Sequence, residues 1–317
     1  MTRSAFDSVH IDPPPSDEQH DLLFSAADLA RRIPNLTHLS LIVDGDRTFS
    51  IDQTDTDQQQ RKQARLAAQG VVGVCLDLHD KLQVARTGAL VRLVLETPAG
   101  AALAYTIPRR GHLVGFCLRD PHLPAEPSLA VAPEVQEADR ALAGLAAEAR
   151  ELFELSDQNP GGFQPIAPSA VLPPPTGSPV ITGNAHARLL SICREAIDER
   201  LQYVLYLSND GTAFAVDCFG GLDLPETHGD TSPARLRRVY WGFHTDLDGD
   251  LRDLRRLVYP VLGRAARAVV LDVEDGAVIT RWLGGGRQVV GVTLVQAYVA
   301  SVEDRFAELC GRLDEAG

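Results

Sequence analysis

The sequence has no apolar run that approaches the ~20 residues of a membrane-spanning helix. Its N-terminus, MTRSAFDSVHIDPPPSDEQ, also lacks the apolar core of a secretory signal. The 5 cysteines are odd in number, widely spaced and never arranged as Cys-x-x-Cys, which argues against a disulfide framework and the usual zinc motifs. Cys75, Cys117 and Cys310 fall on apolar faces of predicted elements, so we expect reduced core thiols in a cytoplasmic protein.

Positive charge is scarce, and lysine most of all. Lysine occurs only at Lys62 and Lys81 among 30 basic residues, against 43 acidic ones, and the formal net charge is −13. A nucleic-acid-binding protein neutralises phosphates with a basic surface, so this balance argues against nucleic acid as a partner. The preference for arginine over lysine is typical of a GC-rich bacterial genome.

Common catalytic and phosphate-binding motifs are missing as well. No GxxxxGK[ST], GxGxxG, HExxH or GxSxG segment is present. Gly284–Gly286 lies between two predicted strands, which predicts a hairpin turn, whereas a phosphate loop would open a helix. The segment TDLDGDLRD begins like a calcium loop, but Leu251 and Leu257 stand where such a loop needs Gly and Glu.

The 9 histidines include no i,i+4 pair, and we interpret His38, His112 and His244 as structural or surface residues. Strand alternation places His112 and Cys117 on opposite faces, so they form no catalytic pair. The sequence therefore assigns no catalytic, cofactor-binding or metal-ligating residue, and we expect a protein that is not an enzyme. A site assembled from residues distant in sequence is left open.

What the chain does contain is a repeated stretch. Ala268–Leu294 has three β-branched runs separated by turn residues, which predicts a three-stranded antiparallel meander. Val91–Leu118 has the same layout, and HLVGFCL (112–118) matches QVVGVTL (288–294) at an offset of 176 residues, with Gly115 matching Gly291. The chain therefore contains two copies of one domain.

Each copy is expected to follow the order α-β-β-α-β-β-β-α. In the first copy this is a helix from Ser16, a hairpin over His38–Val43 and Arg47–Asp52, a helix with Thr56 and Gln59 at capping-box spacing, the meander, and a helix from Pro133. The helix stripe after Pro133 extends to Leu152 and Phe153. The hairpins match at an offset of 165 residues, so the second copy carries 11 extra residues before its meander.

The expected organisation is a disordered tail over 1–15, a domain over 16–155, a Pro-rich linker over 156–180 and a second domain over 181–317. The second domain opens with a helix over Asn184–Leu201. Its long central helix starts after Ser232 and Pro233, and two glycines within it predict a bend or break near 245–249.

The segment LARRIPNLTHLSLIVDGDRTFSID, together with residues 58–118, resembles the roadblock / dynein light chain family. The resemblance covers about 22–155 and, in the second copy, 184–315. It implies a five-stranded antiparallel sheet flanked by helices in each domain. It also implies dimerisation, here between the two copies of one chain or between chains, and a non-enzymatic role as a partner of small Ras-like GTPases.

The expected function is thus a cytoplasmic regulator or scaffold that binds a protein partner, such as a small GTPase, without cofactor or membrane. The basic side of the second long helix is either an exposed face with i,i+3 and i,i+4 ion pairs or a docking surface. Candidate interface residues are Trp241, Arg235, Arg238, Arg252 and Arg256. Alternatives are a ligand sensor of GAF or PAS type, which needs a deep apolar pocket, and a chaperone-like secretion adaptor.

Overall fold

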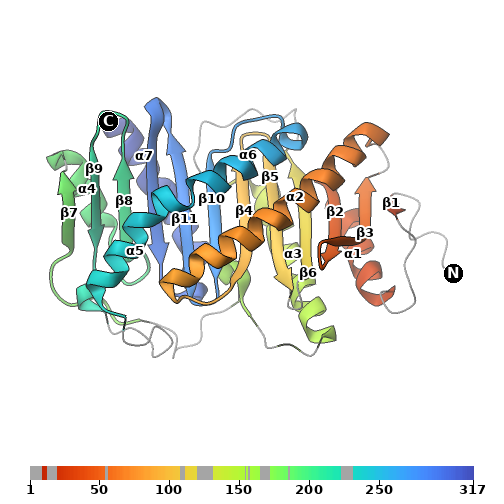
Figure 1. Ribbon diagram of the computed structural model, residues 1–317, viewed down its shortest axis with the longest axis horizontal. Coiled ribbons are helices and arrows are strands. Elements are labelled where there is room, and N and C mark those ends of the chain that lie inside the picture. The colour runs from red at the N-terminus through yellow and green to blue at the C-terminus, as the bar shows by residue number, and fades with distance from the viewer. Residues whose placement is uncertain are drawn as a thin grey trace.

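The computed structural model describes residues 9–12, 20–53, 56–107, 111–119, 131–153, 155, 158–164, 172–184, 186–222 and 231–317. Within these ranges, seven α-helices and twelve strands build a mixed α/β structure in which every strand joins one antiparallel sheet (Figure 1). The fold class is therefore confirmed at the level of mixed α and β structure with an antiparallel sheet.

The two halves of the chain contain the same series of elements. The first half comprises β1 (Val9–Asp12), α1 (His20–Arg32), β2 (Leu36–Val43), β3 (Asp46–Gln53), α2 (Gln58–Leu82), β4 (Leu90–Thr97), β5 (Gly100–Ile107), β6 (Gly111–Leu118) and α3 (Pro133–Leu152). The second comprises β7 (Val180–Asn184), α4 (Ala187–Ala196), β8 (Tyr203–Leu207), β9 (Ala213–Asp217), α5 (Pro233–Asp246), α6 (Asp248–Leu262), β10 (Ala268–Val273), β11 (Gly276–Leu283), β12 (Arg287–Thr293) and α7 (Val299–Ala316). The helix pair α5 and α6 occupies the place of α2.

The strand order is β1-β3-β2-β6-β5-β4-β10-β11-β12-β8-β9-β7, which reads the same in both halves from the middle outward. The halves meet where β4 pairs with β10 in antiparallel register, with Val94 opposite Val270. This arrangement gives the chain an approximate twofold axis between β4 and β10.

Each half contributes six strands to the sheet, so the expected five were too few. The additional strands are β1, which pairs with β3, and β7, which pairs with β9 at the other edge. Residues 9–12 were expected to belong to a disordered tail, and this expectation was wrong; the rest of 1–15 lies outside the described residues. The linker expected over 156–180 contains a 3-10 turn, Pro160–Gly162, with Pro160 and Gly161 buried.

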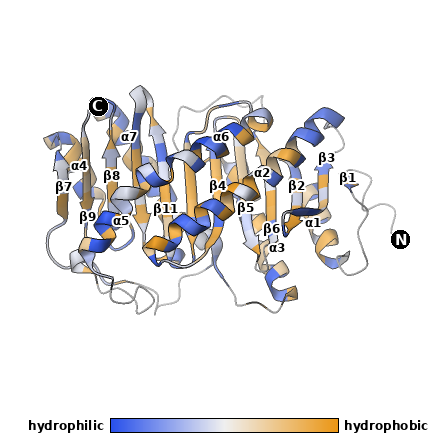
Figure 2. Ribbon diagram, viewed as in Figure 1, coloured by the Kyte–Doolittle hydropathy of each residue, from blue (hydrophilic) through white to orange (hydrophobic). Residues whose placement is uncertain are grey.

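Two apolar cores fill the space between the sheet and its helix layers. α2, α5 and α6 cover one face, in front of the sheet in Figure 1, while α1, α3, α4 and α7 cover the other. On β4, Leu93 and Leu95 face the α2 core and Val94 faces the α3 core, as strand alternation requires. Both cores extend across both halves, and Figure 2 shows the apolar strands between the more mixed helices.

The helix boundaries bear out part of what the sequence predicts. The long helix of the second half breaks at Leu247, within the expected window, so the acidic segment there is a helix junction. The capping box of α2 is formed by Asp57 and Gln60, one residue beyond the expected pair. α4 is shorter than expected and spans only Ala187–Ala196. Leu152 and Phe153, expected in the core, are 55% and 37% exposed.

All five cysteines are buried and free, in agreement with the expectation of reduced core thiols. Burial raises the pKa of each thiol to about 12. A thiol in such surroundings remains protonated and packs as a small apolar side chain.

The matched glycines of the two meanders allow the covering helices to approach the sheet. A Cβ at Gly115 would lie 2.9 Å from Leu142 Cδ1 of α3, and a Cβ at Gly291 would lie 2.6 Å from Phe306 Cε2 of α7. The two positions are therefore equivalent in the fold, but the neighbour differs. A leucine methyl moves more easily than a fully buried ring.

Alanine at either glycine is expected to destabilise the protein by overpacking, by about 1–3 kcal/mol, with the larger loss for Gly291→Ala. The free energy of unfolding from urea titration measures this. Gly144→Ala and Gly311→Ala, in the same covering helices and with no atom within 4 Å of the new Cβ, are the controls and should not destabilise. Equal stability of Gly291→Ala and the unsubstituted chain would contradict this packing argument.

Candidate functional site

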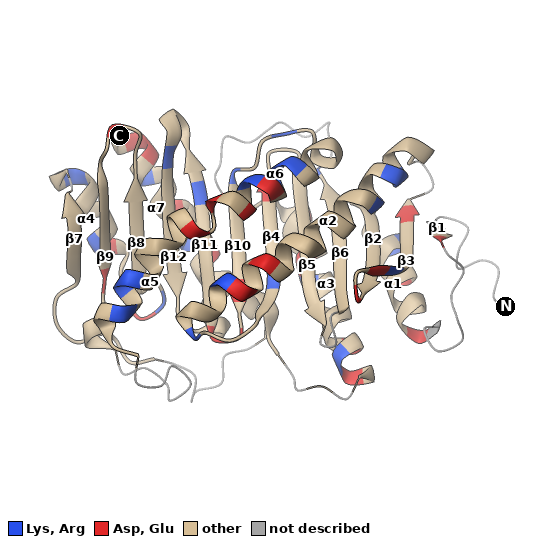
Figure 3. Ribbon diagram, viewed as in Figure 1, with Lys and Arg blue, Asp and Glu red and all other residues tan. Residues whose placement is uncertain are grey.

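The residues that the sequence proposed as a partner interface are divided between two helices. Arg235 and Arg238 are exposed on α5, while Arg252 and Arg256 are exposed one turn apart on α6. The α6 pair makes the ion pairs that the plainer interpretation requires. Arg252 pairs with Asp248, and Arg256 Nη1 lies 3.4 Å from an Asp253 oxygen. Figure 3 shows both signs of charge along α6.

Trp241 is only partly buried on α5, where it packs against the α2-side core and meets His244 edge-on with ring centroids 6.2 Å apart. Two neighbouring arginines do not belong to the exposed face. Arg237 turns inward and donates two hydrogen bonds to Asp217, and Arg255 lies over the Trp282 ring at 4.8 Å. The exposed basic surface of α5 and α6 is therefore smaller than the number of arginines in their sequence indicates.

A surface that the sequence did not single out lies along α2 and α6. These two helices run side by side across the middle of the sheet (Figure 1) and approach closely at Gly70, where an added Cβ would lie 2.6 Å from Leu257 Cδ2. Large apolar side chains remain exposed on this layer: Leu66 is 58% exposed, Leu76 45% and Tyr259 56%. The sequence carries a signal for part of this surface, because Leu66 and Leu76 fall outside the apolar stripe that predicts the buried face of α2.

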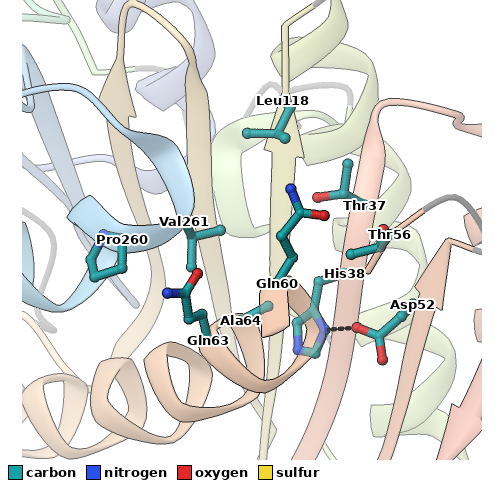
Figure 4. A pocket seen from close by; sticks show the side chains of 10 residues that line it. All are labelled: Thr37, His38, Asp52, Thr56, Gln60, Gln63, Ala64, Leu118, Pro260 and Val261. Atoms are coloured by element: carbon teal, nitrogen blue, oxygen red, sulfur yellow. Dashed lines mark hydrogen bonds and ion pairs between the residues drawn. The ribbon is translucent and has the colours of Figure 1, made fainter. Parts of the chain in front are cut away.

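A pocket of about 390 Å³ lies beside this helix pair, between the N-terminal half of α2, the β2–β3 hairpin and the C-terminal end of α6 (Figure 4). Both halves of the chain contribute to it. Its lining residues are Thr37, His38, Asp52, Thr56, Gln60, Gln63, Ala64, Leu118, Pro260 and Val261. In Figure 4 the carboxamide of Gln60 lies near Thr37 and Leu118, and that of Gln63 lies near Pro260 and Val261 of α6.

A buried polar network forms the floor of this pocket. His38 Nδ1 lies 2.6 Å from Asp52 Oδ1, and His38 Nε2 lies 2.7 Å from Ser40 Oγ. Arg65 of α2 donates to the other Asp52 oxygen at 2.8 Å and also pairs with Asp12 of β1. Burial raises the pKa of the Asp52 carboxyl, but the hydrogen bonds and charges of His38 and Arg65 outweigh it, so the pKa lies below its usual value.

The hairpin sequence positions this network. His38 and Asp52 are directly opposite one another in the β2–β3 register, and Ser40 lies two residues further on the same face. A serine, a histidine and a carboxylate in this order resemble a hydrolase triad. Ser40 is fully buried, however, so the arrangement presents no nucleophile to a substrate. The interpretation of His38 as structural is consistent with this geometry.

The corresponding place in the second half has different contents. At the offset of 165 residues, Asp217 takes the place of Asp52 and Tyr203 that of His38, and Arg237 pairs with Asp217 as Arg65 pairs with Asp52. Tyr203 stacks on Phe219 with ring centroids 5.7 Å apart and lies 5.8 Å from the ring of Tyr240. Aromatic rings thus fill this place in the second half.

A second buried ionic cluster lies on the other face of the sheet, at the junction of the halves. Arg92 of β4 donates to Asp139 of α3, to both Asp272 oxygens of β10 at 3.2 Å, and to Glu303 of α7 at 2.8 Å. Tyr105 donates to the Asp139 carboxylate at 2.5 Å. One buried cation therefore faces three carboxyl groups, two of them from the other half of the chain.

The turn in the linker covers this cluster. The backbone N–H of Gly161 donates to Asp272 at 2.6 Å, and the Phe163 ring lies 5.5 Å from the Arg92 guanidinium. Burial raises the pKa of Glu303 to about 8 in spite of the charge of Arg92. Burial raises the pKa of Asp272 as well, with Arg92 opposing it.

Within the described ranges, no group of three or more His, Cys, Asp or Glu side chains is arranged to hold a metal ion. None of the helices in this part of the chain combines the length and the apolar character that a bilayer crossing requires. Comparison of the chain with protein-family models and with curated proteins found no match.

Proposed function

We propose that the chain is a cytoplasmic, non-catalytic regulator or scaffold built from two tandem roadblock-like domains, and that it binds a protein partner on the α2–α6 layer. The observation that carries this proposal is the pairing of β4 with β10, which joins two copies of one unit into a single sheet beneath two adjacent helices. An internal pseudo-dimer of this kind is what the resemblance to the roadblock family implies, and a small Ras-like GTPase is the partner class that it implies.

The α2–α6 layer has the composition of a docking surface. Leu66, Leu76 and Tyr259 leave large apolar groups in contact with water, which needs a reason in a chain with 43 acidic and 30 basic residues. Arg252 and Arg256 lie on the same helix as Tyr259 and supply a polar rim. Tyrosine and arginine are the residue types that most often dominate binding energy at interfaces.

Glutamate at Tyr259 or at Leu76 is expected to weaken partner binding at least tenfold, because a charge replaces apolar contact area. Native mass spectrometry of the full-length chain with small GTPases from its own genome, loaded with GDP or with GTP, measures the complex. Leu152→Glu is the matched control, since Leu152 is equally exposed but lies on α3, across the sheet.

A complex that forms with one nucleotide state and is lost in the α2–α6 variants alone would support the proposal. Failure of every GTPase to bind in either state, or equal loss with Leu152→Glu, would contradict it. The GAF or PAS alternative requires a deep apolar pocket, whereas six of the ten residues that line the pocket beside α2 are polar.

A further inference from the structure

The pocket between α2 and α6 is open beside His38 of the first half, whereas aromatic rings occupy the corresponding place in the second half. The framework of the two places is the same, because each has a buried aspartate paired with an arginine from the following helix. They differ at His38, whose counterpart Tyr203 joins a cluster of aromatic rings. The fold is therefore compatible with a filled site, and packing alone gives no reason for the opening of about 390 Å³ in the first half.

The charges around the pocket favour an uncharged occupant. Among the described residues, no lysine or arginine lines it, so the described lining offers an anionic ligand no counter-ion. The Asp52 carboxylate in its floor already accepts hydrogen bonds from Arg65 and contacts His38, so a cation would find no free carboxylate there. Burying an unpaired charge is costly, and a neutral ligand avoids that cost.

The polar groups that remain are carboxamides and hydroxyls. Gln60 and Gln63 lie one turn apart on α2, and each carries a planar group with both a donor and an acceptor. Gln60 Oε1 accepts the backbone N–H of Asp57 at 3.0 Å, which orients its carboxamide. Apolar walls flank these groups, with Leu118 on one side and Pro260 and Val261 of α6 on the other.

We propose that this pocket binds a small, neutral, planar molecule with a cyclic amide edge, namely a pyrimidine or purine base or its nucleoside. A carboxamide pairs in two hydrogen bonds with such an edge, as glutamine does with the edge of a nucleic-acid base. The apolar walls accommodate the faces of the ring. A volume near the lower end of the range for small-molecule sites suits a ligand of nucleoside size.

The proposal goes beyond the docking function and does not depend on it. The pocket is made by the first half and by the end of α6 from the second, so an occupant contacts both halves at once. Its presence would stabilise the position of α6 beside α2. Partner binding on the outer side of these helices is a separate property, which is measured separately.

Isothermal titration calorimetry of the full-length chain with uridine, and separately with guanosine, tests the proposal by measuring the heat of binding. We expect at least one of them to bind with a Kd below about 1 mM. For the nucleoside that binds, the form methylated on its ring N–H (N3-methyluridine or N1-methylguanosine) should bind at least tenfold more weakly, because the amide edge is then blocked. Ribose alone should show no heat of binding.

The Gln63→Leu variant should also weaken binding at least tenfold, since the apolar leucine side chain can make neither of the two hydrogen bonds. Gln69→Leu is the matched control, because Gln69 is an exposed glutamine on the same helix that lines a different groove. Thermal unfolding of both variants establishes that they fold. Binding of neither nucleoside, or equal affinity of the Gln63→Leu variant and the unsubstituted chain, would overturn the proposal.

Discussion

Replacement of Arg92 by methionine is expected to lower the free energy of unfolding at pH 7 by about 3–5 kcal/mol, the range for breaking a buried ion pair by removing one partner. Arg92 is 1% exposed and is the cation that compensates Asp139, Asp272 and Glu303. Methionine fills a similar volume but donates no hydrogen bond. The three carboxyl groups would then remain buried without a cation, and of their hydrogen bonds described above only those from Tyr105 to Asp139 and from the Gly161 N–H to Asp272 would be left.

Urea unfolding of the Arg92→Met variant measures this loss. Arg252→Met is the control, because Arg252 also pairs with an aspartate but on the exposed surface of α6, where such pairs contribute little. Arg92→Lys should fall between the two, since one ammonium group does not reproduce the several directions of the guanidinium donors. A loss for Arg92→Met no larger than that of the control would contradict this account.

Replacement of Glu303 by glutamine is expected to stabilise the protein above pH 8 and to change little near pH 5. The pKa of Glu303 rises from 4.5 to about 8 on folding, so between these values the folded state holds a proton that the unfolded state has released. The stability that this group contributes therefore falls as the pH rises through this window. Glutamine stays neutral throughout and still accepts a hydrogen bond from Arg92.

The expected difference between the two proteins is on the order of 5 kcal/mol at pH 9, which lies above both the folded and the unfolded pKa of Glu303. The free energy of unfolding is measured for both chains at several pH values, and one set is subtracted from the other. Contributions from titratable groups that the two chains share cancel in this difference. Glu308→Gln, at an exposed position of α7, is the control, and its free energy of unfolding should change with pH as that of the unsubstituted chain does. A glutamine variant that is less stable at pH 9 than at pH 5, relative to the unsubstituted chain, would refute the assignment.

The sequence predicts the elements whose signal is local. The second meander is predicted because Asp-Gly and Gly-Gly pairs separate its β-branched runs, and the first because it has the same layout; β10 to β12 and β4 to β6 confirm both. β1 and β7 could not be found in this way. Each is a segment of four or five residues next to prolines, and its order comes from pairing with β3 or β9, which are distant in the sequence.

The candidate pocket shows the same limit. The hairpin that carries His38 and Asp52 could be predicted from the sequence, although its Asp44-Gly45 turn alone would place His38 opposite Ile51, and a bulge between Leu41 and Ile42 shifts the register so that Asp52 lies there. The opposite wall could not, since Pro260 and Val261 lie about 200 residues further along and reach the pocket only because α6 runs beside α2. Arg92 and Asp272 likewise meet only when β4 pairs with β10.

The junction between β4 and β10 also has a genetic consequence. Both strands belong to one polypeptide, so translation always supplies the two halves in a one-to-one ratio, and dilution does not separate them as it separates subunits. An assembly of identical subunits must accept every mutation on both sides of its axis. Here a codon change alters one side only, which lets each half acquire its own residues while the other preserves the shared framework.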